Sequence, residues 1–288
     1  MKIKNIDVHV LKSQLETPFA FSQGWVRQRA ATLVEITTDT GVTGWGEAFT
    51  QGLETPEIAA AAIKSCFADM LIGENPLDIE RLWFDMYHRS RDFGRKGAVM
   101  AAISGIDIAL WDLLGQVKEE PIYKLLGYKE ATRKLPYASV LFGDTAEETL
   151  KKASDIRKVG FSAIKFGWGP FGRGSVQDDA DHIHAAREGI GADAHLMIDA
   201  GTIFHEDVEA AAARLQALSD ANVLWYEEPF DAAALASYGE LAKRTPKVKL
   251  AGGEGAHNGT LVGASTVSRD VLRSSSDRGV AVVRGGDD

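Results

Sequence analysis

The chain has 288 residues, 45% hydrophobic and 25% charged, which is the composition of a globular protein with one large domain or two smaller ones. Its net charge of −9, without an evident basic face, argues against a nucleic-acid partner, and its single cysteine, Cys66, excludes an internal disulfide bond. No secretory signal and no apolar run near the roughly 20 residues that cross a membrane are evident, so we expect a cytoplasmic protein with no membrane partner.

Residues 1–130 are predicted to form an α+β capping domain. Residues 2–11 alternate apolar and polar side chains, as a half-buried strand does. Residues 31–38 and 44–49 flank the turn sequence DTG and are predicted to form a β-hairpin. Three helices are expected to follow, over residues 56–70, 76–87 and 97–117.

Residues 131–258 have a different pattern, in which short apolar runs alternate with helical segments. Such alternation is typical of a parallel sheet, and five units in succession favour a barrel. A doubly wound sheet is the alternative architecture. The predicted strands cover residues 137–142, 163–166, 195–199, 223–227 and 249–254, and the predicted helices cover residues 145–159, 176–188, 206–218 and 232–243.

Three acidic residues end three of these apolar runs: Asp199 in HLMIDAG, Glu227 in VLWYEEP and Glu254 in KLAGGE. The intervals of 28 and 27 residues match one strand–loop–helix unit. In a (β/α)8 barrel the C-terminal ends of the strands meet on the face that carries the active site. Carboxylates that meet there repel one another unless a cation lies between them, and oxygen ligands of this kind suit Mg²⁺.

The last segment, residues 259–288, is atypical. It uses only eight residue types, whereas residues 1–258 use all twenty. One interpretation is a disordered, low-complexity polar tail. The other, which we favour, is a C-terminal truncation or frameshift after about Asn258, because all eight types can be written with GC-rich codons. On this interpretation the barrel is incomplete.

Several segments together resemble the mandelate racemase/muconate lactonising enzyme family of the enolase superfamily. The resemblance covers roughly residues 1–257 and implies an α/β fold, in which an α+β capping domain is followed by a (β/α)7β TIM-type barrel, incomplete in this chain. The segments that carry it are GVTGWGEAF (41–49), AISGIDIALWDLLGQ (102–116), PIYKLLG (121–127), WYEEP (225–229) and AGGE (251–254).

The resemblance implies one Mg²⁺ held by Asp199, Glu227 and Glu254. Each of these acids, taken alone, could instead be a loop acid or a helix N-cap. Glu228 follows Glu227 directly, and since side chains alternate along a strand, the two should point in different directions. We predict that Glu227 is the ligand and that Glu228 is a supporting acid behind the ligand shell.

Lys165 lies at the end of the second predicted barrel strand, in AIKFGWGP. The family commonly has Lys-x-Lys here; Lys165 matches the first lysine, and Gly167 stands in place of the second. We predict that Lys165 is catalytic, as an acid/base or as a contact to the substrate carboxylate, the alternative being a solvated lysine. The missing second lysine disfavours the muconate cycloisomerase and dipeptide epimerase types.

Four residues are predicted to bind substrate: Phe21, Trp25, Trp168 and His257. Phe21 and Trp25 fall in a segment that resembles a loop of the cap that closes over the substrate, where aromatic side chains exclude water. Trp168 and His257 follow the second and fifth predicted strands closely. For the aromatic residues, packing in a core is the alternative.

Two further groups of residues are expected at the surface. A basic cluster in RSRDFGRK could reach an acidic substrate, but a solvated turn is the preferred interpretation; it comprises Arg89, Arg91, Arg95 and Lys96. Three histidines on helices or in loops are also expected to be exposed: His182, His184 and His205.

The resemblance implies Mg²⁺-dependent abstraction of a proton α to the carboxylate of a small substrate, an acid sugar. Sugar-acid dehydratase is the preferred activity; a racemase or epimerase of the same family and a non-catalytic metal- or acid-binding fragment are the alternatives. Family members often form homo-oligomers and often use a later histidine as base. Because no histidine follows His257, we predict weak or no catalysis by this chain.

Overall fold

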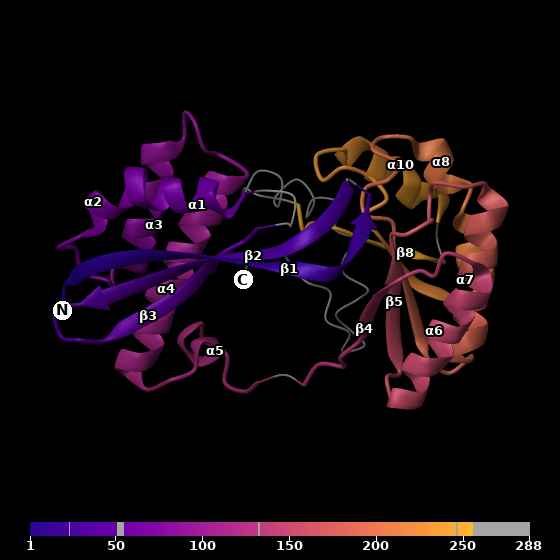
Figure 1. The fold of residues 1–288 in the computed structure, drawn as a ribbon, viewed down its shortest axis with the longest axis horizontal. Helices are drawn as coiled ribbons and strands as arrows, with labels where there is room; N and C mark the ends of the chain where they lie inside the picture. The colour runs from indigo at the N-terminus through magenta and orange to yellow at the C-terminus, as the bar shows by residue number, and fades with distance from the viewer. Residues whose placement is uncertain (23, 51–54, 132, 246, 256–288) are drawn as a thin grey trace. The chain divides into compact units, whose positions relative to one another are not determined.

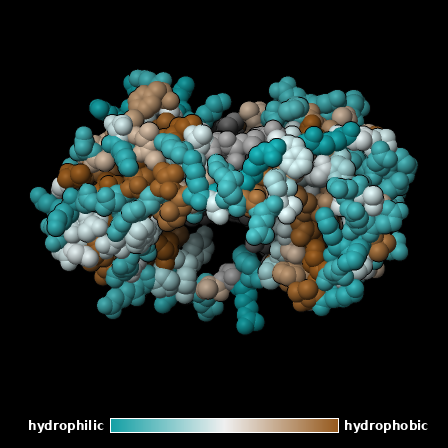
Figure 2. Space-filling model, viewed as in Figure 1, coloured by the Kyte–Doolittle hydropathy of each residue, from teal (hydrophilic) through white to brown (hydrophobic). Residues whose placement is uncertain are grey.

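The structure is a computed structural model that describes residues 1–22, 24–50, 55–131, 133–245 and 247–255. The chain divides into two compact units (Figure 1). The first unit comprises Met1–Phe19 and Trp25–Thr132, and the second comprises Ala20–Gly24 and Arg133–Asp288. Hydrophilic side chains cover much of the visible surface of each unit (Figure 2). The predicted tail, residues 259–288, lies outside the described residues.

The first unit contains a three-stranded sheet of order β1-β2-β3. Its strands are β1 (Ile3–Phe21), β2 (Gly24–Thr38) and β3 (Thr43–Ala48). The predicted hairpin is confirmed, because β2 and β3 pair antiparallel with Thr37 opposite Thr43. The strand predicted to end at residue 11 continues to Phe21, past the segment KSQLETP, which is mostly polar and contains a proline.

The helices of the first unit lie against part of this sheet (Figure 1). The predicted helix over 56–70 consists of α1 (Pro56–Ala62), a π-helical turn η1 (Ile63–Phe67) and α2 (Ala68–Leu71). Two more predicted helices are α3 (Ile79–Ser90) and α4 (Ala98–Lys118), and a short α5 (Ile122–Leu125) follows.

Helix α4 packs directly on β3 because both elements carry glycine at the contact. A Cβ atom placed on Gly46 would lie 2.0 Å from the carbonyl oxygen of Gly105, so neither backbone could approach this closely with a larger residue. By length and hydropathy alone α4 could cross a membrane. Its apolar residues Ile103, Ile106 and Leu110 are instead fully buried in the core of the first unit.

The second unit has the predicted alternation of strands and helices. Its five strands form a sheet of order β4-β5-β6-β7-β8, and every neighbouring pair is parallel. They are β4 (Ala138–Leu141), β5 (Ala163–Gly167), β6 (His195–Asp199), β7 (Val223–Glu227) and β8 (Lys249–Ala251). The connecting helices are α6 (Ala146–Val159), α7 (Val176–Ile190), α8 (Val208–Ala212), α9 (Leu215–Asp220) and α10 (Leu235–Arg244).

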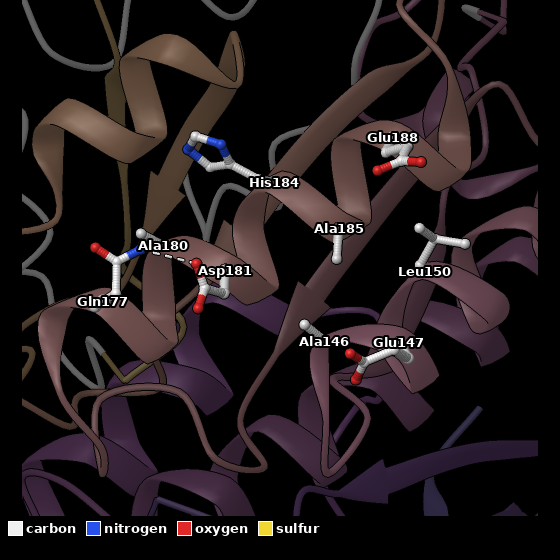
Figure 3. A pocket seen from close by; sticks show the side chains of 9 residues that line it. All are labelled: Ala146, Glu147, Leu150, Gln177, Ala180, Asp181, His184, Ala185 and Glu188. Atoms are coloured by element: carbon white, nitrogen blue, oxygen red, sulfur yellow. Dashed lines mark hydrogen bonds between the residues drawn. The ribbon is translucent and has the colours of Figure 1, made fainter.

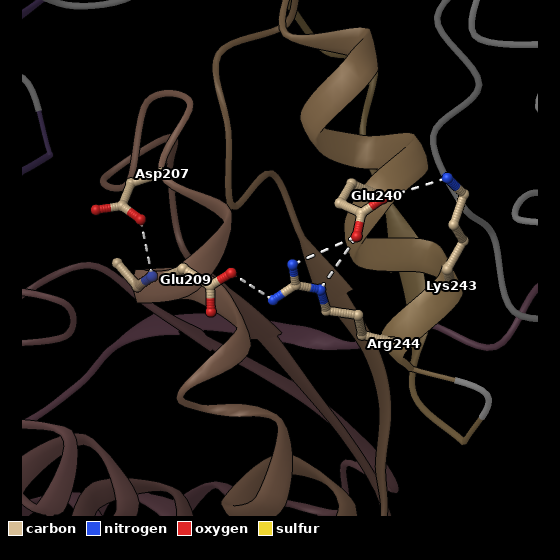
Figure 4. Close-up of polar contacts among 6 residues, drawn as sticks. Asp207, Glu209, Glu240, Lys243 and Arg244 are labelled. Carbon is tan, nitrogen blue, oxygen red and sulfur yellow. Dashed lines mark hydrogen bonds and ion pairs between the residues drawn. The ribbon is translucent and has the colours of Figure 1, made fainter.

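The single helix predicted over residues 206–218 is wrong, because it is divided between α8 and α9 at Arg214. The Arg214 guanidinium is buried, where its Nε donates to Asp179 Oδ2 at 2.9 Å and its Nη1 donates to the carbonyl of Ala210. A buried charge requires such a partner. On the outer surface, Arg244 of α10 forms an ion pair with Glu209 of α8 at 2.7 Å (Figure 4).

Candidate active site

The candidate site lies at the C-terminal ends of three adjacent parallel strands. In the sheet, Gly167 of β5 is level with Asp199 of β6, which is level with Glu227 of β7. Because side chains two residues apart share a face, Lys165 lies on the same face of β5 as Gly167. This register places the side chain of Lys165 between the two carboxylates.

The ammonium group of Lys165 is bound by both carboxylates. Its Nζ atom lies 2.9 Å from Asp199 Oδ2 and 2.6 Å from Glu227 Oε1. Lys165 is only 8% exposed, so this is a buried charge cluster and not the solvated strand-end lysine that was the alternative. The ring of Tyr137, centred 5.8 Å from Nζ, covers another side of the ammonium group.

The second oxygen of each carboxylate also accepts a hydrogen bond. Glu227 Oε2 accepts a hydrogen bond from the indole Nε1 of Trp225 at 2.8 Å, and Asp199 Oδ1 accepts one from the backbone N–H of Gly201 at 2.9 Å. Sequence reasoning missed Trp225, although the signal was present: it stands two residues before Glu227 on the same strand. These donors fix the orientation of both carboxylates.

Burial and charge act in opposite directions on Lys165. Burial alone would lower the pKa of its ammonium group, but the adjacent carboxylates of Asp199 and Glu227 outweigh burial and raise the pKa above its ordinary value. Burial also raises the pKa of the Glu227 carboxyl, and the neighbouring charge of Asp199 raises it further. Lys165 is therefore protonated in this arrangement.

Gly167 is required by the close approach of Asp199. A Cβ atom at position 167 would lie 2.9 Å from Asp199 Cβ and 3.0 Å from the Asp199 carbonyl oxygen. A larger side chain would therefore displace one of the two strands' ends. This crowding gives a physical reason for glycine at position 167.

Glu228 lies at the break where β7 ends. Its backbone has a positive φ of 41°, and its Oε1 accepts a hydrogen bond from Gly253 N–H at 3.2 Å. Glu228 and Glu227 thus bind different partners. Burial, helped by the charges of Glu254 and Asp199, raises the pKa of Glu228 to about 7.

The structure brings together two of the three predicted metal ligands. Strand β8 ends at Ala251, and Glu254 lies exposed in the turn that follows. Within the described part of the chain, no three acidic, histidine or cysteine side chains converge closely enough to hold a metal ion. The donor set nevertheless fits Mg²⁺, because partly buried carboxylate oxygens from adjacent strand ends already share one cation, the Lys165 ammonium group, and the charge of Glu254 reaches the same region.

The predicted substrate-binding residues are distributed as follows. Trp168 directly follows β5 and packs beside Gly201, where an added Cβ would lie 2.3 Å from Trp168 Nε1. Trp25 lies in the first unit, 59% exposed, with the Arg27 guanidinium 5.9 Å from its ring centre. Phe21 is the last residue of β1, but its side chain, like all of His257, lies outside the described residues.

The expectation that His182 is exposed is wrong. It is buried on α7, and its Nδ1 is 2.9 Å from Thr149 Oγ1 on α6.

A separate groove of about 300 Å³ lies on the outer side of α6 and α7 (Figure 3). It is lined by Glu147, Asp181 and His184 among others, and none of its lining residues belongs to a strand end, so it is distinct from the candidate site.

Comparison with known sequences agrees with this geometry. Residues 5–127 match the profile "Mandelate racemase / muconate lactonizing enzyme, N-terminal domain", and residues 148–262 match the profile "Enolase C-terminal domain-like". A solved structure described as a predicted mandelate racemase from Rhodobacter sphaeroides is 40% identical, covering 97% of this chain and 76% of its own, with a TM-score of 0.77. The chain belongs to the mandelate racemase/muconate lactonising enzyme family.

Relatives in this family are named as enzymes of several kinds. D-galactarolactone cycloisomerase of Agrobacterium fabrum is 35% identical over 89% of this chain and 66% of its own. D-galactonate dehydratase of Xanthomonas oryzae is 35% identical over 77% of this chain and 57% of its own. A racemase structure from Streptomyces coelicolor with bound magnesium is 27% identical, with a TM-score of 0.83, over 93% of this chain and 74% of its own. The chain thus spans less than two thirds of the length of these two curated relatives.

Proposed function

We propose that this chain carries the site of a Mg²⁺-dependent enzyme that abstracts a proton α to a carboxylate, and that the reaction is the dehydration of an acid sugar. The observation that carries the proposal is the pair of largely but not fully buried carboxylates, Asp199 and Glu227, that meet around Lys165 at the C-terminal ends of parallel strands. Catalytic residues gather at such strand ends. The dehydratase and cycloisomerase among the relatives support an acid-sugar substrate.

Asp199 and Glu227, with Glu254 as the third ligand, would hold the Mg²⁺. When bound, the cation supplies stabilisation of the negative charge that develops on the substrate carboxylate. Trp225 and the backbone N–H of Gly201 orient the two buried carboxylates for this role. Hydrogen-bond donors that orient the ligands of a metal commonly influence the affinity of the site for that metal.

Lys165 is the proposed proton-transfer group, because its Nζ is the ammonium group that lies between the two carboxylates. Trp168, which packs beside Gly201, is proposed to contact the substrate. Phe21, Trp25 and His257 remain proposed substrate-binding residues.

Catalysis by this chain is proposed to be weak. In the metal-free arrangement Asp199 and Glu227 hold Lys165 in its protonated form, in which it cannot accept a proton. Gly167 leaves no room for a second lysine. Within the described residues, no histidine bonds to Asp199, Glu227 or Lys165.

Two alternatives remain open. A racemase or epimerase is supported by the magnesium-bound racemase structure, but the crowding at Gly167 disfavours chemistry that needs a second lysine at that position. A non-catalytic protein that binds Mg²⁺ and an acid would share the carboxylate pair and differ only in turnover.

Exchange of the α-proton of acid sugars in D₂O, followed by NMR, separates an enzyme of either kind from a non-catalytic protein. Slow exchange that requires Mg²⁺ and is lost in Lys165→Met supports the proposed enzyme. Rapid exchange would show that catalysis is not impaired. Binding of an acid sugar without exchange supports the non-catalytic function, and failure to bind either Mg²⁺ or an acid sugar contradicts the proposal.

A further inference from the structure

Helix α3 of the first unit has a partly exposed aromatic surface. Trp83 and Tyr87 stack with ring centres 5.3 Å apart and an interplanar angle of 10°. Phe84, which is 47% exposed, meets the edge of Trp83 at 5.3 Å and stacks with His88 at 6.2 Å. Trp83 and Tyr87 are half-buried against the core, and Phe84 and His88 are exposed, so the four rings form a partly exposed cluster. Aromatic residues are enriched at interaction surfaces.

The charges on the two sides of this cluster have opposite signs. On the N-terminal side of the cluster, Arg81 forms ion pairs with Glu74 at 2.5 Å and with Asp85 at 3.0 Å. Acidic groups therefore predominate there, and Glu80 is exposed. On the C-terminal side of the cluster, Asp92 pairs with Arg91 at 3.5 Å but is outnumbered by exposed basic residues. These are Arg89, Arg91, Arg95 and Lys96.

A groove of about 570 Å³ lies at the basic end of the helix. It is lined by Tyr87, His88 and Arg91, together with Asp92 and Arg95. The aromatic cluster therefore continues into a hollow whose rim is cationic. An acidic or aromatic side chain would fit this hollow.

We propose that this face of α3, defined by Glu80, Phe84, Tyr87, His88 and Arg91, binds the same face of a second copy of the chain, with the two helices antiparallel. Glu80 and Arg91 are eleven residues apart, about three helical turns, so they lie on the same side of the helix. A two-fold axis between Phe84 and Tyr87 places Glu80 of each copy opposite Arg91 of the other. It also places Phe84 opposite Tyr87 of the second copy.

The face is thus complementary to itself. An isologous interface needs one patch in which each group meets its complement on the second copy. Here the acidic end meets the basic end twice, and the aromatic rings form the centre. A partner of one charge sign would satisfy only half of this face.

The test is the oligomeric state of the full chain, measured by sedimentation velocity over a wide range of concentration at low salt. The wild-type chain should form a dimer that added salt weakens. Phe84→Asp should abolish the dimer. Because Phe84 is exposed, the thermal unfolding of this variant should resemble that of the wild-type chain. Val159→Asp, at a position 78% exposed on α6, is the matched control and should dimerise normally.

A charge exchange makes the test specific. Glu80→Arg and Arg91→Glu should each raise the dimer dissociation constant at least about tenfold, because like charges then face each other. The double variant should restore dimerisation to within about threefold of wild type, since each copy regains opposite charges. A wild-type chain that is monomeric at every concentration overturns the proposal. So does a dimer that survives Phe84→Asp or is not restored by the double exchange.

Discussion

Trp225 Nε1 donates a hydrogen bond of 2.8 Å to Glu227 Oε2, two residues farther along β7. The other oxygen of Glu227 binds Lys165 at 2.6 Å. Trp225 is 3% exposed, and its ring meets the edge of Tyr137 at 5.8 Å. The indole therefore fixes the carboxylate in a position from which it can bind a cation.

Replacing this indole should weaken metal binding. Trp225→Phe retains an aromatic ring but removes the N–H donor, so we expect the Mg²⁺ dissociation constant to rise roughly tenfold. Isothermal titration calorimetry measures this change directly. Trp83→Phe on α3 is the matched control, because it changes a half-buried tryptophan in the other unit and should leave Mg²⁺ binding unaltered. Equal affinity in both variants would contradict the role of Trp225.

Lys165 should stabilise the protein when Mg²⁺ is absent. Lys165→Met leaves the carboxylates of Asp199 and Glu227 buried without a cation, so we expect a loss of about 3 kcal/mol in the free energy of unfolding. Added Mg²⁺ should recover most of this loss. Thermal unfolding with and without Mg²⁺ measures both effects. Lys158→Met, which removes an exposed ion pair, should cost less than about 1 kcal/mol. A variant of Lys165 that unfolds like wild type without Mg²⁺ would refute this account.

A side chain at position 167 should destabilise the protein. In Gly167→Ala the new Cβ would meet Asp199 Cβ at 2.9 Å, so we expect a loss of about 1–3 kcal/mol in stability from overpacking. Gly239 on α10 has nothing within 4 Å of an added Cβ, and Gly239→Ala should stabilise its helix by about 0.5–1 kcal/mol. Chemical denaturation compares the two. The same sign of effect in both variants would show that the crowding at Asp199 is unimportant.

Much of the second unit could be predicted from sequence. Strands β6 and β7 begin and end at the predicted residues because their apolar runs are short and bounded by turns. The pairing of Lys165 with Asp199 and Glu227 could not be predicted, since it depends on the lateral register of three strands. The periodicity of α7 did not reveal that His182 is buried, because its partner Thr149 lies on another helix.

Asp107 should make the stability of the protein depend on pH. Burial raises the pKa of its carboxyl to about 6, from an unfolded value of 3.8. The native state therefore binds the proton more tightly, and the stability gained from it is present below pH 3.8 and is lost as the pH rises through 6. Asp107→Asn should remove this slope and raise the free energy of unfolding at pH 8 by about 1–2 kcal/mol, after allowance for partial exposure of the group. Denaturation midpoints measured across this range would disprove the assignment if the variant kept the wild-type slope.

The central claim is that Asp199 and Glu227 hold a divalent cation. Its most direct test is calorimetric titration of Mg²⁺ into the wild-type chain and into Asp199→Asn, which keeps the shape of the side chain but removes its charge. We predict one binding site in the wild-type chain and at least about a tenfold loss of affinity in the variant. No binding by the wild-type chain, or equal binding by both proteins, would contradict the claim.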